Sequence, residues 1–193
     1  MRNNQKLDKI DIKILEELSE NPQSTLTNIA SNTKISRPTI TTHLKDLSDS
    51  GLLLYKAGPS LKNMNFVTAL VALEVKGEQS RLDTEKYISY CPRVMNIFRT
   101  PGKANLHVFC WGEDENTLTA TIETFRNMPS TEVISTLNLG HLVSGDFTID
   151  LSKEKNKDSP CGKLICSECQ TYQAGDCFGC PSTKDYKGPL RAD

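Results

Sequence analysis

The residues best suited to chemistry are five cysteines that crowd into the last part of this 193-residue chain. Cys166 and Cys169 form one Cys-x-x-Cys pair, Cys177 and Cys180 form a second pair, and Cys161 precedes both. Each pair can turn two thiolates toward one centre, and four thiolates complete a tetrahedron at about 2.3 Å from Zn²⁺. The sequence therefore predicts a zinc site whose candidate ligands are Cys161, Cys166, Cys169, Cys177 and Cys180.

Other chemistries fit the same cysteines. The Cys-x4-Cys-x2-Cys spacing of Cys161, Cys166 and Cys169 also occurs in plant-type ferredoxins, and Cys180-Pro181 is similar to the Cys-Pro of bacterial ones. An iron–sulfur cluster is therefore the alternative cofactor. Thiols that switch by oxidation without a metal, and a tail stapled by disulfides, are the remaining interpretations. Five cysteines for four ligand positions leave one spare.

A second set of candidate residues lies on a helix predicted to begin at the N-cap residue Ser36. Ile40, Leu44 and Leu47 recur at helical spacing and predict one buried stripe. The rest of the helix surface is small or cationic and carries no acid between positions 34 and 45. Side chains of this kind can enter the major groove of double-stranded DNA. The predicted DNA-binding residues are Lys34, Ser36, Arg37, Pro38, Thr39, Thr41, Thr42, His43, Lys45 and Lys56, with Arg37, Thr39, Thr41 and Thr42 as the expected base contacts.

The neighbouring segments complete a helix-turn-helix. Helical spacing predicts a first helix over 7–18 and a second from about residue 24, followed by a tight turn at 32–34. Residues 52–55, followed by Gly58-Pro59, predict the strand and turn of a wing. Residues 1–62 are therefore expected to form a winged helix-turn-helix DNA-binding domain.

The pattern changes over residues 63–151. Alternating apolar residues predict strands over 67–75, 94–100, 105–111 and 131–139, and helical spacing predicts helices over 81–91 and around 118–125. The order βαββαβ is the ferredoxin-like arrangement, so the fold class is α+β. Two helices cover one face of such a sheet, yet both faces of the first and third strands are apolar. A second copy of the chain is expected to cover the other face, giving a homodimer.

Composition limits the remaining possibilities. The chain is 37% apolar and 24% charged with a net charge of −1, so any nucleic-acid contact must come from a local basic patch. The start of the chain lacks a secretory signal, and the longest apolar stretch, 66–75, is too short to span a bilayer. We expect a cytoplasmic protein with no membrane contact.

The sequence predicts a charged linker over residues 152–160 and a Cys-rich metal-binding tail over residues 161–193. No nucleophile–base pair or phosphate-binding loop is visible, so an enzyme is not expected.

Residues 7–151 resemble the Lrp/AsnC (feast/famine) transcription regulators of bacteria and archaea. The resemblance is carried by the opening Leu7-Asp8-Lys9-Ile10-Asp11, by the helix entry Ile35-Ser36-Arg37-Pro38-Thr39-Ile40, and by Asn65-Phe66-Val67-Thr68-Ala69 leading into Val75-Lys76-Gly77. It implies a DNA-binding dimer that can assemble further into octamers. It also implies regulation by a small molecule, often an amino acid, bound where the middle domains meet.

The resemblance assigns effector binding to the turn after the second strand, here with Thr100, Gly102 and Asn105 as candidate residues. In this chain Lys103 and Ala104 replace acidic and aromatic residues that the family usually has there. The combined prediction is a sequence-specific transcription regulator, modulated by a metal, redox state or small effector through its cysteine cluster. The alternative is a metal- or iron–sulfur-carrying binding or sensor protein in which DNA binding is secondary.

Overall fold

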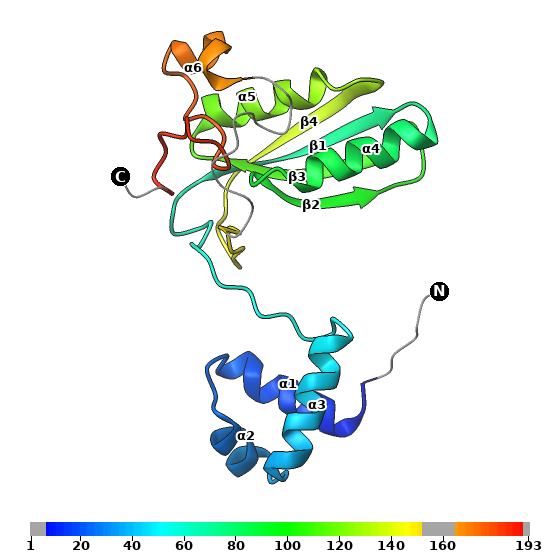
Figure 1. Ribbon diagram of the computed structural model, residues 1–193, viewed down its shortest axis with the longest axis vertical. Coiled ribbons are helices and arrows are strands. Elements are labelled where there is room, and N and C mark those ends of the chain that lie inside the picture. The colour runs from blue at the N-terminus through cyan, green and yellow to red at the C-terminus, as the bar shows by residue number, and fades with distance from the viewer. Residues whose placement is uncertain (1–6, 152–164, 191–193) are drawn as a thin grey trace. The chain divides into compact units, whose positions relative to one another are not determined.

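The computed structural model describes residues 7–151 and 165–190, and the chain divides into two compact units, Met1–Lys56 and Ala57–Asp193 (Figure 1). The sequence predicts the first boundary at residue 62, whereas the structure assigns residues 57–62 to the second unit. The reason is packing, because Leu61 is fully buried against Phe66 and Trp111 of the second unit.

The first unit is a bundle of three helices: α1 (Lys9–Glu20), α2 (Leu26–Thr33) and α3 (Arg37–Asp49). The Asp8 side chain caps α1 and forms a reciprocal capping box with Asp11. Ser36 caps α3, as the sequence predicts, by accepting a hydrogen bond from the Thr39 N–H. One apolar cluster holds the three helices together, and its buried members are Ile14, Leu18, Ile29 and Ile40. The predicted helix-turn-helix is confirmed.

The strand predicted over 52–55 is wrong. The backbone N–H groups of Leu52 and Leu53 both donate to the Leu47 carbonyl, at 2.9 and 3.0 Å, and so complete the end of α3. Leu54 and Tyr55 are then 69% and 60% exposed. Leu53 packs on the helical cluster, but among the described residues no neighbouring strand pairs with this segment, so it does not form a strand.

The second unit contains a four-stranded antiparallel sheet in the order β2-β3-β1-β4. Its strands are β1 (Val67–Val75), β2 (Val94–Arg99), β3 (Leu106–Gly112) and β4 (Thr131–His141). Two helices, α4 (Glu78–Ser89) and α5 (Glu115–Arg126), pack on one face (Figure 1). The predicted βαββαβ arrangement is confirmed. Helix α4 begins three residues earlier than predicted, after Gly77 with its positive φ of 88°.

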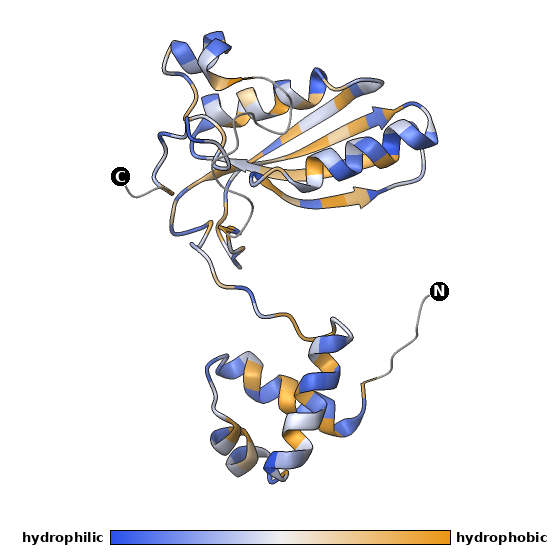
Figure 2. Cartoon of the chain, in the orientation of Figure 1, coloured by the Kyte–Doolittle hydropathy of each residue, from blue (hydrophilic) through white to orange (hydrophobic). Residues whose placement is uncertain are grey.

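The core of this unit lies between the sheet and the two helices. Every second residue of β1, from Val67 to Val75, is buried there, and β1 and β3 are largely apolar (Figure 2). Helix α5 contributes Leu118, Ile122 and Phe125. Gly112 ends β3 where a Cβ atom would lie 2.6 Å from the Leu118 backbone nitrogen. Only glycine permits this close approach of β3 and α5.

The helix-free face of the sheet is partly covered by the chain itself. Phe66 and Trp111 stack there with ring centroids 5.0 Å apart, inside a small cluster that includes Leu61 and Ile149. Residues 59–61 pair with residues 147–149 through two backbone hydrogen bonds of 2.8 and 2.9 Å. The segment that enters this unit and the segment that follows β4 therefore lie side by side.

The rest of that face carries exposed apolar side chains. Leu137 and Leu139 of β4 are 59% and 48% exposed, and Phe98 of β2 is 51% exposed. Cross-strand pairing places Leu137 beside Leu70 of β1, which lies in turn beside Phe109 of β3. These residues form a continuous apolar stripe on the face opposite the helices.

The described part of the C-terminal tail folds onto the second unit. It begins with η1 (Cys166–Glu168) and α6 (Gln170–Gln173) and continues in loops to residue 190. The predicted linker 152–160 and the candidate ligand Cys161 lie outside the described residues. Among the described residues, no helix is long and apolar enough to cross a membrane.

Candidate functional site

The exposed face of α3 presents the predicted DNA-binding side chains. Arg37, Thr41, Thr42 and Lys45 are exposed along the helix, and Lys34 is exposed at the left-handed turn before it. The stretch from 34 to 45 holds no acid, so its cations are not opposed by a carboxylate within that stretch. This is the charge pattern expected of a surface that approaches phosphates.

The hydroxyl groups of Thr41 and Thr42 donate hydrogen bonds to backbone carbonyls of α3. Thr41 Oγ1 donates to the Arg37 carbonyl at 3.0 Å, and Thr42 Oγ1 donates to the Pro38 carbonyl at 3.1 Å. Because each hydrogen is directed into the helix, the oxygens present acceptor lone pairs outward. Such acceptors suit the amino groups of adenine or cytosine, and the methyl groups suit thymine.

The other predicted contacts differ in exposure. Ser36 and Thr39 share a hydrogen bond of 2.8 Å between their hydroxyls at the start of α3, and Thr39 is half-buried. Pro38 is exposed in the first turn. Lys56 is exposed but lies beyond α3, at the last residue of the first unit, so the structure does not bring it into the helix surface.

His43 has a partner within its own unit. Its Nδ1 lies 2.7 Å from Oδ1 of Asp11 and so joins α3 to α1. The hydrogen bond with Asp11 raises the pKa of His43 above its ordinary value, and the same bond lowers the pKa of Asp11. Asp8, Asp11 and His43 are the only three potential ligand groups of the described chain within 4.8 Å of one another, but both aspartates already cap α1. The structure therefore gives His43 a helix-joining contact that sequence reasoning missed.

The predicted effector turn is held closed by its own polar groups. The Asn105 side chain accepts from the Val75 N–H at 3.0 Å and donates to the Val75 carbonyl at 2.9 Å. Thr100 Oγ1 donates to the Ala104 carbonyl at 2.7 Å and lies 3.0 Å from Nδ1 of His107. Gly102 is exposed with a φ of 115°. Thr100 and Asn105 thus shape the turn in this structure.

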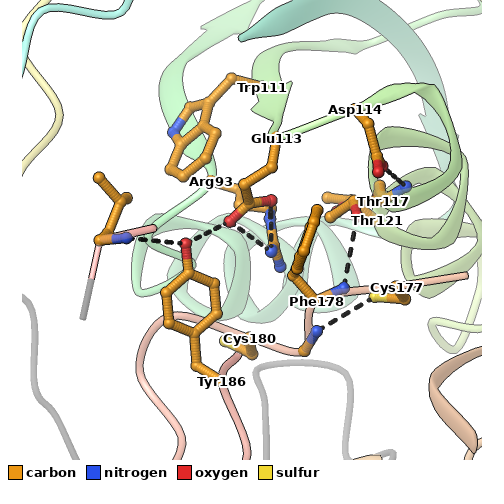
Figure 3. A network of polar contacts seen from close by, with 12 residues as sticks. Arg93, Trp111, Glu113, Asp114, Thr117, Thr121, Cys177, Phe178, Cys180 and Tyr186 are labelled. Atoms are coloured by element: carbon orange, nitrogen blue, oxygen red, sulfur yellow. Dashed lines mark hydrogen bonds and ion pairs between the residues drawn. The ribbon is translucent and has the colours of Figure 1, made fainter. Parts of the chain in front are cut away.

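A buried ion pair lies where the tail meets the sheet (Figure 3). Arg93 Nη2 is 2.7 Å from Glu113 Oε2, and the two side chains are only 5% and 2% exposed. The Arg93 guanidinium also lies over the rings of Trp111 and Tyr186, at 5.6 and 6.0 Å from their centroids. Burial alone would lower the pKa of Arg93, but the neighbouring Glu113 carboxylate raises it, so the guanidinium stays charged.

Two hydrogen bonds attach the tail to this corner between β3 and α5 (Figure 3). The Tyr186 hydroxyl donates to Glu113 Oε1 at 2.6 Å, and the Phe178 N–H donates to Thr117 Oγ1 at 3.4 Å. Burial, followed by the Glu113 charge, raises the pKa of Tyr186, which keeps the hydroxyl protonated as a donor. The tail is therefore integrated with the second unit through polar contacts.

The four described tail cysteines line one cavity of about 680 Å³ between the tail and α5, with Arg93 also in its wall. None of them is in a disulfide. Burial raises the pKa of Cys177, and it raises the pKa of Cys180 to about 12. Burial thus favours the protonated thiols of Cys177 and Cys180.

Cys91 and Cys110 are buried in the core of the second unit. Burial raises the pKa of Cys110 to about 12, so its thiol is inert packing. Sequence reasoning missed Arg93, Glu113 and Tyr186, because no local pattern links a strand-flanking ion pair to a tyrosine far along the chain.

Comparisons with known proteins match either the first unit alone or most of the chain. Residues 7–53 match the family described as winged helix-turn-helix DNA-binding. No curated protein matches the chain in a sequence comparison. Solved structures match over most of the chain, however, and define its fold class as a winged helix-turn-helix followed by a βαββαβ domain.

Three of these structures illustrate the likeness. A transcriptional regulator from Neisseria meningitidis in complex with L-methionine is 22% identical, with a TM-score of 0.63, over 76% of this chain and 98% of that one. The Mycobacterium tuberculosis leucine response regulatory protein LrpA is 17% identical (TM-score 0.63; 75% and 100% covered). Escherichia coli AsnC is 19% identical (TM-score 0.58; 73% and 97% covered). About a quarter of this chain has no counterpart in them.

Proposed function

We propose that this chain is a sequence-specific, double-stranded-DNA-binding transcription regulator of the Lrp/AsnC type and that it acts without enzymatic activity. The observation that carries the proposal is the exposed, acid-free face of α3, mounted on a three-helix unit that matches a DNA-binding family. The likeness of the whole fold to solved transcription regulators supports the same function.

Base reading and phosphate binding belong to different side chains of α3 in this proposal. Arg37 reads base edges together with the outward-facing oxygens of Thr41 and Thr42. Lys45 and Lys34 neutralise phosphates and set the affinity for any sequence. The two roles are separable by experiment.

The second unit supplies dimerisation. The apolar stripe that runs through Phe98, Phe109, Leu70 and Leu137 is too large to be left in water, and a second copy of the same sheet is the occupant that symmetry favours. A two-fold dimer presents two α3 helices to half-sites about 34 Å apart on DNA. Further assembly into octamers is the family's pattern and belongs to the same proposal.

A small-molecule effector is also part of the proposal, because two of the similar solved structures are described as complexes with L-methionine. In this chain Asn105 and Thr100 are already bonded within the turn. An amino acid effector would therefore have to compete with these bonds or use other groups at a dimer interface.

The tail adds a metal centre that modulates DNA binding. Two Cys-x-x-Cys pairs supply enough thiolates for one four-ligand site, and the spacing along the chain accommodates zinc or an iron–sulfur cluster. A second candidate function rests on the shared cavity of the four cysteines: a metal-carrying sensor in which DNA binding is secondary.

DNA binding is tested by selecting duplexes from genomic fragments and comparing Arg37→Ala with Lys45→Ala. Lys45→Ala should weaken binding to all duplexes. It should also reduce the slope of log affinity against log salt concentration by about one, because one phosphate contact is lost. Arg37→Ala should lose discrimination by about 1–3 kcal/mol if it reads a guanine. Lys76→Ala, an exposed lysine of the second unit, serves as the charge control. Unchanged footprints and affinities for both variants would show that α3 does not contact the DNA. A wild-type protein that binds no duplex would favour the metal-carrying sensor.

A further inference from the structure

The four described cysteines of the tail converge on one cavity although they come from two separate loops. Cys166 begins the single turn η1 and Cys169 follows it, and the Cys169 N–H donates to the Cys166 carbonyl at 3.1 Å. Cys177 and Cys180 flank Gly179, and all four side chains line the cavity of about 680 Å³ that the tail forms against α5. The fold thus gathers four cysteine side chains around one open cavity.

Backbone groups in the second loop are aimed at sulfur. The Gly179 N–H donates to Cys177 Sγ at 3.4 Å (Figure 3), and the Ser182 N–H donates to Cys180. Gly179 has a φ of 81°, and a Cβ atom there would lie 2.9 Å from the Asp185 carbonyl oxygen. This conformation is therefore reserved for glycine. N–H donors to cysteine sulfur are the contacts that tune thiolate-ligated metal clusters.

The separation of the sulfurs distinguishes the possible occupants. Four thiolates at about 2.3 Å from one tetrahedral zinc ion lie about 3.8 Å from one another. Any four of the five tail cysteines include at least three described ones. Yet among the described residues no three cysteine sulfurs lie within 4.8 Å of one another. A single zinc ion would therefore require the loops to close further than this arrangement does.

A polynuclear cluster has a different requirement. In a cluster at most two cysteine thiolates share one iron atom, so three sulfurs need not lie as close together as the ligands of one ion. The cavity between the tail and α5 has room for such a core, and cysteines line it on the tail side.

The cavity wall carries charges of both signs, because Glu123 and Asp176 line it together with Arg93. The buried Arg93 guanidinium favours the thiolate forms of Cys177 and Cys180. The Glu113 carboxylate opposes this effect at Cys177. Glu113, Trp111 and Tyr186 hold this guanidinium in place (Figure 3). A fixed cation beside the sulfurs is a recognised means of stabilising and tuning a cluster.

We propose that Cys166, Cys169, Cys177 and Cys180 bind an iron–sulfur cluster in the cavity between the tail and α5, with Arg93 as its fixed positive neighbour. The proposal deepens the proposed metal centre of the tail and rests on it. Cys161 is the spare cysteine in this assignment, and zinc is the competing occupant.

The test uses the full chain purified without oxygen. Iron, zinc and acid-labile sulfide are measured per chain, and visible absorption is recorded before and after a chemical reductant. The expected result is iron and sulfide in equal amounts, with a broad visible absorption that the reductant bleaches. Protein that holds zinc alone, and takes up no iron and sulfide when these are supplied anaerobically, overturns the proposal.

Serine variants test the ligand set. Cys169→Ser and Cys177→Ser should each lose most of the iron, whereas Cys161→Ser should keep it. Cys91→Ala is the matched control, because Cys91 is buried near Cys180 but does not line the cavity. Iron retained in Cys169→Ser and Cys177→Ser, or lost in Cys161→Ser, overturns the assignment of ligands.

The DNA-binding assay is run on the same samples and gives an independent result. Iron-loaded protein that binds no duplex removes the proposed DNA function and leaves the cluster site standing. Zinc-only protein that binds DNA removes the proposed cluster and leaves the proposed DNA-binding function standing.

Discussion

The Tyr186 hydroxyl donates a hydrogen bond of 2.6 Å to Oε1 of Glu113, across 73 residues of sequence. Glu113 is at the same time the partner of Arg93, so this one contact attaches the tail to a buried charge pair. A hydrogen bond to a charged acceptor is worth about 1.5–3 kcal/mol, which makes Tyr186 a principal anchor of the tail.

Replacing Tyr186 with Phe should therefore loosen the tail while leaving the sheet folded. The amide of Phe178 should exchange with solvent faster, because its hydrogen bond to Thr117 forms only when the tail is docked. Hydrogen-exchange mass spectrometry measures this directly. Tyr55→Phe, which removes the hydroxyl of an exposed ring in the first unit, should change nothing in the tail. Equal exchange in Tyr186→Phe and wild type would contradict the anchoring role.

The contact between His43 and Asp11 should make the first unit pH-sensitive. The folded-state pKa of His43 lies above its ordinary value of 6.5, so the stabilisation is complete below that value and is lost as the pH rises through the folded pKa. The folded-state pKa of Asp11 is lowered, so on the acid side the stabilisation is lost only as the pH falls through that lowered pKa. The bond is strongest between these limits.

An NMR titration of the His43 ring checks this sign. In Asp11→Asn the pKa of His43 should fall back toward about 6.5, because the carboxylate that raises it is gone. The loss of stability of the first unit at alkaline pH should disappear in His43→Asn. His141→Asn, a change in the second unit, should keep the wild-type pH dependence. A His43 pKa that does not move in Asp11→Asn would refute the assignment.

Asn105→Ala should destabilise the second unit. The side chain satisfies both the N–H and the carbonyl of Val75 at the end of β1, and its removal leaves two partly buried backbone groups without these partners. The expected loss in the free energy of unfolding is about 1–3 kcal/mol, measured by chemical denaturation. Asn63→Ala, an exposed asparagine of the second unit outside the sheet, should change it by less than about 0.5 kcal/mol. Equal effects would show that the turn does not depend on these bonds.

Leu137→Asp should convert the proposed dimer to a monomer. A carboxylate in the centre of an apolar sheet-to-sheet contact would be buried without a partner. Light scattering coupled to size-exclusion chromatography reports the mass. Leu82→Asp introduces the same charge at an exposed position of α4, away from that face, and should leave the mass unchanged. A wild-type mass equal to that of one chain would show that the protein is a monomer and would contradict the proposed dimer.

The elements with regular apolar spacing were predictable from the sequence. The stripe of Ile40 and Leu47 and the alternation of β1 each follow from one local period, and the structure contains both elements. The strand predicted over 52–55 was wrong because β-propensity alone does not form a strand where, among the described residues, no neighbouring strand pairs with the segment. The start of α4 was missed because Gly77, and no side-chain cap, begins it.

The candidate site was predictable only in its residue types. The cysteine spacing indicated a shared centre, but nothing in the sequence pointed to Arg93 as part of the wall of that cavity. Its partner Glu113 is 20 residues away, and Thr117 and Phe178 are 61 residues apart. Contacts of this kind form only when helices and strands pack together, so they cannot be predicted from the local spacing of residues.

Residues 59–61 and 147–149 pair side by side, and Gly58 lies so close to the Ile149 carbonyl that no side chain fits between them. The segment that enters the second unit is thus held against the segment that follows β4. A side chain at position 58 would force these two segments apart and break both hydrogen bonds at once. The two ends of the βαββαβ domain therefore keep or lose their places together.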